Sequence, residues 1–214
     1  EGDAPATVNP SLWRQARLNG IHGLFQVTEG IYQLRGFDLA NMTIVAGESG
    51  WILVDPLTTA ATSRAALAFA REHLGDQPIR AVLFTHSHID HFGGVDGVLN
   101  DEERQGLRVV APVGFMEEAV SENLLAGSTM QRRATFMYGR NLPVSAVGHV
   151  DTGLGKEPAR GGQVGILEPT DIISQTGQTL EIDGVAFEFQ NAGGSEAPAE
   201  FTFYLPQHKA FSGA

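Results

Sequence analysis

Thr85-His86-Ser87-His88-Ile89-Asp90-His91 follows directly on the apolar run Ala81-Val82-Leu83-Phe84, and these two adjoining segments decide the fold. A short run without polar residues is typical of a strand that is covered on both faces of a sheet. In α/β proteins, ligand sites form at the carboxyl ends of such strands, where the connecting loops diverge. The polar run therefore stands where an α/β protein places its functional groups.

Four side chains of this run are good metal ligands, and their spacing divides them into two pairs. His86 and His88 are two positions apart, so in an extended segment they point the same way and can bind one ion. Asp90 and His91 follow as the chain turns toward Gly93-Gly94, and they can face a second ion nearby. We expect the two glycines to let the backbone bend and to start a helix close to the metals.

A pair of metal ions lowers the pKa of a bound water and clamps both the attacking and the departing group of a reaction. Imidazole and carboxylate suit zinc, although mixed nitrogen and oxygen sites also admit manganese or iron. A histidine-rich surface turn is the competing interpretation. Neither helical nor strand packing accounts for three histidines and an aspartate directly after a buried strand, so we favour the metal site.

The rest of the chain predicts an α/β layered domain. We expect the helix over residues 62–74 to be capped by Thr62 or Ser63 and stopped by Gly75, and Pro112 to open a later helix. Residues 141–170 are rich in Gly and Pro and predict a long surface loop. Strand patterns cover residues 24–55, 81–84, 107–111, 179–189 and 201–205, and helical patterns cover residues 12–18, 62–74, the segment after 112 and 129–138. We place a lead-in at 1–23 and one domain at 24–214.

Composition narrows the classes of function. The net charge of −11 argues against a nucleic-acid partner, whose phosphates are bound mostly by cations. The absence of cysteine excludes disulfides, Cys-ligated zinc and a thiol nucleophile. No apolar run is long enough to span a membrane. The start at Glu1 and a strand that breaks off near Ala214 lead us to expect part of a longer, processed chain, and we place that protein in the periplasm or outside the cell.

The polar run matches the His-x-His-x-Asp-His signature of the metallo-β-lactamase superfamily, whose fold is an αββα sandwich. Asp55 in Val54-Asp55-Pro56 resembles the aspartate at a strand end that supports the metal loop in that superfamily. The closer resemblance is to its zinc-dependent alkylsulfatases. That likeness runs from about Leu24 onward, and its clearest segments are residues 31–41, 50–59, 86–94 and 194–200.

The resemblance implies a site of two Zn²⁺ ions that hydrolyses an alkyl sulfate ester. In most of the superfamily a histidine supplies the next ligand of the first metal, whereas in alkylsulfatases a glutamate does. Glu196 matches that position, and Glu200 is the alternative. His86, His88, Asp90 and His91 complete the ligands found in this chain, and Asp90 is also the catalytic candidate.

The substrate anion has candidate partners elsewhere. The loop at residues 148–156 resembles one that helps to hold sulfate in that family, which makes His149 and Lys156 candidate substrate-binding residues. Arg132-Arg133 could pair with sulfate, although a solvated helix face is the simpler interpretation. His22, His73 and His208 have no partners at metal spacing, and we expect structural roles for them.

The resemblance also implies parts that residues 1–214 do not contain. A bridging glutamate is expected just beyond Ala214, a histidine for the second metal lies further on, and the dimerisation and C-terminal domains are separate. We therefore expect an incomplete αββα sandwich, a homodimer formed through other regions, and no competent enzyme from residues 1–214 alone.

Two other functions compete with this interpretation. Another hydrolase of the superfamily, such as a lactonase, thioesterase or β-lactamase, is disfavoured by Glu196 in place of histidine. A non-catalytic metal-binding domain is disfavoured by the full set of His86, His88, Asp90 and His91, since a scaffold needs no pair of metals that activates water. Primary or secondary substrates, and C–O or S–O cleavage, stay open.

Overall fold

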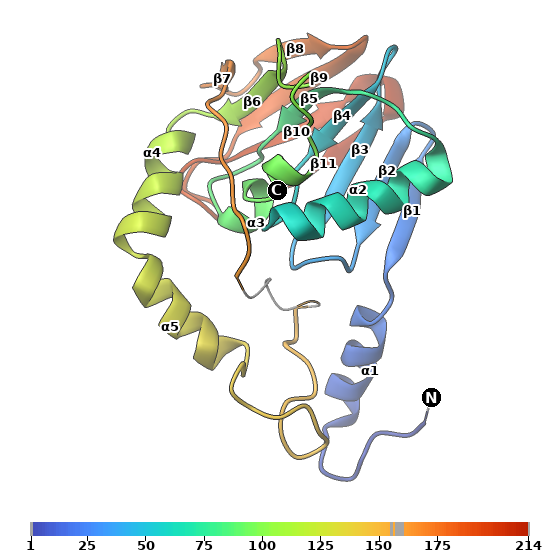
Figure 1. The fold of residues 1–214 in the computed structure, drawn as a ribbon, viewed down its shortest axis with the longest axis vertical. Helices are drawn as coiled ribbons and strands as arrows, with labels where there is room; N and C mark the ends of the chain where they lie inside the picture. Colours follow the sequence, from blue (N-terminus) through green and yellow to red (C-terminus); the bar gives the residue numbers. More distant parts are fainter. Residues whose placement is uncertain (1, 155, 157–160, 214) are drawn as a thin grey trace.

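The computed structural model describes residues 2–154, 156 and 161–213. Its strands form a larger sheet with the order β1-β2-β3-β4-β5-β6-β7 and a smaller antiparallel sheet with the order β11-β10-β9-β8 (Figure 1). The larger sheet contains β1 (Gly23–Thr28), β2 (Ile31–Arg35), β3 (Met42–Ala46), β4 (Trp51–Val54), β5 (Ile79–Leu83), β6 (Arg108–Pro112) and β7 (Asp171–Ile173). The smaller sheet contains β8 (Thr179–Ile182), β9 (Val185–Asn191), β10 (Phe201–Leu205) and β11 (Ala210–Ser212).

Alternate residues of the central strands belong to two separate cores. Leu53 and Val82 pack in one core with α2 (Ala60–Leu74), whereas Ile52 and Leu83 pack in the other with β8, β9 and β10. Successive side chains of a strand point to opposite faces, so one apolar strand supplies both cores. The described residues therefore form α, β and β layers, and the expected α/β fold with two stacked sheets is confirmed.

The helix α2 begins earlier than its sequence pattern predicts. Thr59 is the N-cap: its hydroxyl accepts a hydrogen bond from Thr62 N at 3.3 Å, and Thr62 Oγ1 accepts one from Thr59 N at 3.2 Å. Thr62 occupies the third helical position (N3) of this reciprocal capping box, so the expected cap at Thr62 or Ser63 is wrong. Gly75 ends the helix with a φ of 87°, as expected.

The prediction that Pro112 opens a helix is also wrong. Pro112 is the last residue of β6, and α4 (Phe115–Val120) begins after a left-handed Gly114 with a φ of 83°. A π-helical turn, η2 (Ser121–Leu125), joins α4 to α5 (Gly127–Met137). Leu124 in η2 is 77% exposed, so the helical segment that follows residue 112 does not bury all of its large apolar side chains.

The N-terminal helix α1 (Pro10–Asn19) and the loop after α5 lie together at one end of the molecule, away from the sheets (Figure 1). Thr7 Oγ1 donates to Ala146 O at 2.7 Å, and Asn19 Nδ2 donates to Asp151 Oδ1 at 3.0 Å. The segment from residue 141 to 170 is irregular wherever it is described, which confirms the predicted loop. Every helix in the described part of the chain is too short or too polar to cross a membrane.

Candidate metal centre

The histidine run begins one residue after β5, between two parallel neighbours. β5 pairs with β4 on one side and with β6 on the other, and the segment after it turns into the short helix α3 (Ile89–Phe92). Phe84 and His86 are fully buried, whereas His88 is partly exposed. The carboxyl ends of β4 and β5 thus present the run at one edge of the sheet, as the sequence predicts.

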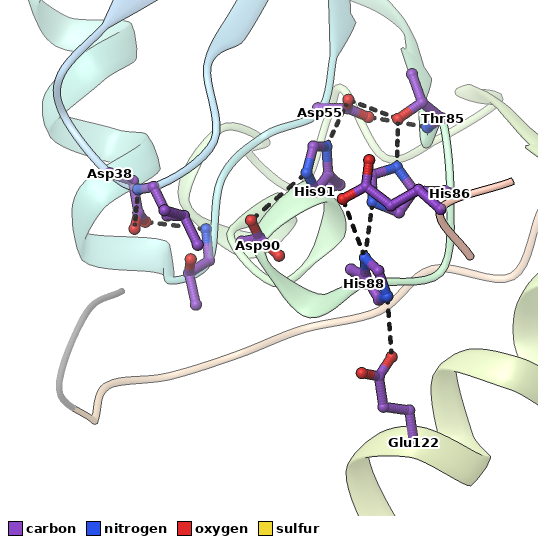
Figure 2. Close-up of polar contacts among 11 residues, drawn as sticks. Asp38, Asp55, Thr85, His86, His88, Asp90, His91 and Glu122 are labelled. Atoms are coloured by element: carbon purple, nitrogen blue, oxygen red, sulfur yellow. Dashed lines mark hydrogen bonds and ion pairs between the residues drawn. The ribbon is translucent and has the colours of Figure 1, made fainter. Parts of the chain in front are cut away.

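Asp55, directly after β4, holds the histidine run in place through its carboxylate. Its carboxylate accepts hydrogen bonds from Thr85 N at 2.8 Å and from Thr85 Oγ1 at 2.7 Å, and its Oδ2 lies 2.8 Å from His91 Nδ1 (Figure 2). Asp55 has a φ of 55°, a conformation that is uncommon for residues other than glycine. The backbone bend and the three contacts together aim the carboxylate at the metal loop, in the supporting position that the sequence motif implies.

His86, His88 and Glu196 bring three donor atoms together, all within 4.8 Å of one another. His86 Nε2 lies 3.1 Å from His88 Nδ1, and His88 Nδ1 lies 3.8 Å from Glu196 Oε1. Zinc binds such donors at about 2.0–2.2 Å, which leaves two ligands of one ion roughly 3–4 Å apart. The donor set and its spacing therefore fit a first zinc ion.

Glu196 reaches this cluster because the loop after β9 is bonded to the histidine run. Ser87 N donates to Ala199 O at 3.2 Å, and His86 forms an isolated bridge with Glu200. The Glu200 side chain is buried, and its Oε2 accepts from Glu196 N at 2.7 Å and from Ala197 N at 3.1 Å. Glu200 thus holds the backbone of the loop, while Glu196 faces the two histidines.

Asp90 and His91 form the second pair, with His91 Nε2 3.5 Å from Asp90 Oδ2. Burial lowers the pKa of His91, but the charge of Asp55 and hydrogen bonds to Asp55 and Asp90 outweigh it and raise the pKa to about 10. Burial also raises the pKa of Asp90, whereas the hydrogen bond and charge of His91 hold it below its usual value. Because Asp55 takes Nδ1–H, the Nε2 atom of His91 is the one free to bind a metal beside Asp90.

His86 differs from His91 although their rings lie 3.9 Å apart between centroids. Burial is the largest cause that lowers the pKa of His86, to about 4, and the charge of His91 adds to the effect. A neutral imidazole is the form that binds a metal. Among the described residues, no third donor joins Asp90 and His91 to form a second group of three.

Gly93 and Gly94 lie between two short helices: α3 ends immediately before them, and the 3-10 helix η1 (Val95–Gly97) begins after them with Gly94 as its N-cap, so a helix does start at the glycines as predicted. Their role is close packing: a Cβ on Gly93 would collide with Thr58 O, and one on Gly94 would collide with Pro56 O. Gly93 has an ordinary helical φ of −60°, so space and not backbone freedom requires glycine here. Asp38, labelled in Figure 2, braces the same segment, because it accepts from Thr58 N at 3.1 Å. It also accepts from Thr62 Oγ1 at 2.9 Å.

A cavity of about 1450 Å³ opens over the cluster. Its lining includes His88, Asp90, His91 and Glu196, together with Arg133 of α5 and Tyr138, the residue directly after α5. Burial and the charge of Asp90 raise the pKa of Tyr138, a residue that the sequence did not single out. No local pattern marks this tyrosine, since it reaches the cavity only through the placement of α5.

His149 and Lys156 are not among the residues that line this cavity in the described part of the chain. His149 N donates to Pro143 O at 2.9 Å within its own loop. Their role in substrate binding stays a prediction, because residues 155 and 157–160 beside Lys156 lie outside the described residues. Of the two arginines Arg132 and Arg133, which were considered as partners for sulfate, Arg133 lines the cavity.

Comparisons with known proteins agree with the fold and the cluster. The model of the metallo-beta-lactamase superfamily matches residues 35–103. A linear primary-alkylsulfatase from a Pseudomonas species is 49% identical over 217 residues, which cover 100% of this chain and 32% of the relative. An alkyl/aryl-sulfatase from Saccharomyces cerevisiae is 47% identical and covers 99% of this chain and 33% of the relative.

Solved structures show the same relationship. A stereoselective inverting sec-alkylsulfatase from a Pseudomonas species superposes with a TM-score of 0.93 at 48% identity, and the match covers 99% of this chain and 34% of that chain. A beta-lactamase domain protein from Burkholderia ambifaria, at 20% identity and a TM-score of 0.51 over 85% of this chain and 51% of that one, shows the fold alone.

The layered sheets and the histidine run at the end of β5 define a metallo-β-lactamase fold. Within that superfamily the chain is related to the alkylsulfatases along nearly its whole length, so the resemblance inferred from the sequence is confirmed. The chain spans about a third of the length of these relatives.

Proposed function

We propose that the protein hydrolyses alkyl sulfate esters to an alcohol and inorganic sulfate at a site of two zinc ions. The observation that carries the proposal is the cluster of His86, His88 and Glu196 beneath a large cavity. Two imidazoles and a carboxylate fit zinc, and the carboxylate stands where the alkylsulfatase resemblance places a glutamate. The three alkylsulfatase relatives described above support this choice of substrate class.

Bound zinc supplies Lewis acidity, which makes water acidic enough to yield hydroxide near neutral pH and offsets negative charge on the ester. His86, His88 and Glu196 would hold the first ion, and Asp90 and His91 would contribute to the second. Asp55 keeps His91 in the tautomer whose Nε2 is free for a metal, because it takes the proton on Nδ1 at 2.8 Å. Asp90, beside His91 in the cavity, is positioned to orient the attacking water.

The cavity suits an anion that carries an apolar tail. Arg133 lines the cavity, and its guanidinium group can pair with a sulfate through two parallel hydrogen bonds. Leu39, Met130 and Met137 line the same cavity and provide apolar surface for an alkyl chain. The remaining donors to the second ion and a homodimer stay predictions from the resemblance. A location in the periplasm or outside the cell stays a prediction from the sequence.

Turnover tests the proposal directly. The complete protein, loaded with Zn²⁺, should release sulfate from a primary or a secondary long-chain alkyl sulfate, and elemental analysis should give two zinc ions per subunit. A β-lactam, a lactone and a glutathione thioester serve as comparison substrates for other hydrolases of this fold. Hydrolysis of one of these without sulfate release would overturn the substrate class, and one ion or none per subunit would overturn the two-metal site.

A further inference from the structure

The outer nitrogen of His88 faces a carboxylate that comes from a different part of the fold. Nδ1 of His88 points into the cluster with His86 and Glu196, whereas Nε2 lies 3.9 Å from Glu122 Oε2 (Figure 2). A metal held by Nδ1 leaves the proton of His88 on Nε2. That N–H then needs an acceptor, and Glu122 is the carboxylate placed to accept it.

We propose that Glu122 is a positioning residue for the first metal: its carboxylate accepts the Nε2–H of His88 and so keeps Nδ1 turned toward the ion. This inference rests on the proposed zinc site. Histidines that bind metals commonly donate their other N–H to a carboxylate, which fixes the ring orientation and makes the ligand more basic. The gap of 3.9 Å exceeds a hydrogen bond by about 1 Å, a distance that rotation of a flexible glutamate side chain can close.

The backbone around Glu122 supports a specific role. Glu122 lies in the π-helical turn η2, and such turns occur mostly as single interruptions of helices, frequently at functional sites. The turn lies against the cavity wall, where Glu122, Asn123 and Leu124 all line the large cavity. A regular helix in its place would rotate every side chain that follows.

A second pocket behind His88 gives independent support. It measures about 450 Å³ and is lined by Ser87, His88, Glu118 and Glu122, among others. Ser87 is 1% exposed, and its hydroxyl has no hydrogen-bond partner among the described residues. The pocket surface is otherwise mostly apolar, so the buried Ser87 hydroxyl and the Glu122 carboxylate bring polar atoms to the place where the N–H of His88 must be satisfied.

The partial burial of His88 and Glu122 points the same way. The described residues place His88 within ion-pair distance of Glu122, with the two side chains only 29% and 26% exposed. An imidazole that carries part of a metal's charge would be attracted to this half-buried carboxylate.

The test compares Zn²⁺ affinity in the complete protein and in Glu122→Ala, Glu122→Met, Glu122→Gln and Glu118→Ala variants, by titration against a chromophoric chelator. Removal of the acceptor in Glu122→Ala should weaken Zn²⁺ binding roughly 10- to 100-fold. Glu122→Met, similar in length but without an acceptor, should lose as much. Glu122→Gln should recover most of the affinity because its amide oxygen still accepts, and Glu118→Ala, on the same pocket wall, should bind like the unaltered protein.

A spectroscopic measurement separates positioning from mere folding. The absorption bands of the Co²⁺-loaded protein should shift in Glu122→Ala and Glu122→Met but not in Glu118→Ala. Unchanged Zn²⁺ affinity and Co²⁺ bands in both acceptor-free variants, or an equal loss in Glu118→Ala, would overturn this inference alone. Failure of the unaltered protein to bind Zn²⁺ would overturn the proposed metal site, and this inference with it.

Discussion

The inner and outer halves of the metal centre are built differently. The inner half, made of Asp55, Thr85 and His91, is held by hydrogen bonds of 2.7–2.8 Å at the ends of two covered strands. In the outer half, His88 meets Glu196 and Glu122 only at 3.8 and 3.9 Å, and these residues come from three separate segments. The fold therefore preorganises the inner half, whereas in the outer half the proposed metal ion would draw the donors together.

Asp55→Asn should break the inner half and have the largest effect. The substitution leaves His91 and the Thr85 hydroxyl facing a neutral amide in a buried site, because Asp55 is 6% exposed. Removal of one partner from a buried charged pair typically costs about 3–5 kcal/mol of unfolding free energy. Urea denaturation of the metal-free protein measures this loss.

Asp76→Asn is the matched control for that variant. Asp76 also pairs with a cation, Arg71, at 2.7 Å, but its side chain is 81% exposed. A surface substitution of this kind should change the stability by no more than about 0.5 kcal/mol. Equal stability of the Asp55→Asn and Asp76→Asn variants would show that the inner half is not preorganised.

Glu196→Gln should break the outer half without unfolding the protein. The Glu196 side chain is 56% exposed, and its Oε1 contacts the cluster at 3.8 Å, so little folding energy depends on it. Loss of an anionic ligand should weaken Zn²⁺ binding by at least the roughly 10–100-fold that loss of an outer partner costs. Chelator competition measures the affinity, and urea denaturation of the metal-free form should match that of the unaltered protein.

Glu200→Gln should give the opposite pattern. Glu200 is buried and its carboxylate accepts two backbone hydrogen bonds, which a neutral amide oxygen accepts more weakly, so Glu200→Gln should lower stability more than metal affinity. If the Glu196→Gln variant keeps its zinc and the folded Glu200→Gln variant loses it, the ligand is Glu200.

The two halves should also respond to pH in the metal-free protein. The folded pKa of His91, about 10, lies above its unfolded value near 6.5. Its contribution to the free energy of unfolding is therefore complete below pH 6.5 and is lost as the pH rises toward 10. The folded pKa of His86, about 4, lies below its unfolded value, so stability is lost as the pH falls from 6.5 toward 4. Stability should peak near pH 6.5.

Urea unfolding at pH 5, 6.5 and 9, with a chelator present, measures this profile. The free energy of unfolding should fall by on the order of 1–3 kcal/mol between pH 6.5 and 9. Asp55→Asn should abolish this fall, because Asp55 supplies the charge that raises the pKa of His91. A profile that stays flat between pH 6.5 and 9 would contradict the strong coupling of Asp55 to His91.

Arg108→Gln should have the smallest effect and sets the scale for a pair far from the metals. Arg108 Nη2 lies 2.7 Å from Asp171 Oδ1, with side chains 36% and 24% exposed, and it also binds Glu181 O. Partly exposed pairs contribute about 0–1 kcal/mol, so thermal unfolding should shift only slightly and Zn²⁺ affinity should not change. A loss of stability as large as that from Asp55→Asn would show that the ion pairs of the metal site and of the surface do not differ in their contribution.

Errors in the sequence predictions arose where the deciding contact is distant or ambiguous. Both Thr59 and Thr62 are good capping residues, and the loop before α2 decides that Thr59 takes the N-cap. Gly93 and Gly94 looked like a bend, whereas their necessity comes from the backbone of residues 56–58 pressed against them. Local propensity does not report such close approaches, because they depend on a segment about 36 positions earlier in the chain.

The sequence by itself determined the layered α/β class, the buried strand and the two pairs of donors at residues 86–91. Period-two alternation and ligand spacing are local properties of the chain, so they can be recognised before the fold is known. The folded arrangement was needed to show that Glu196 faces the cluster while Glu200 holds the loop, and that Glu122 reaches His88 from a π-helical turn. Those relationships depend on how the two sheets and α4 pack against each other, and a carboxylate in isolation carries no sign of the neighbour it will meet.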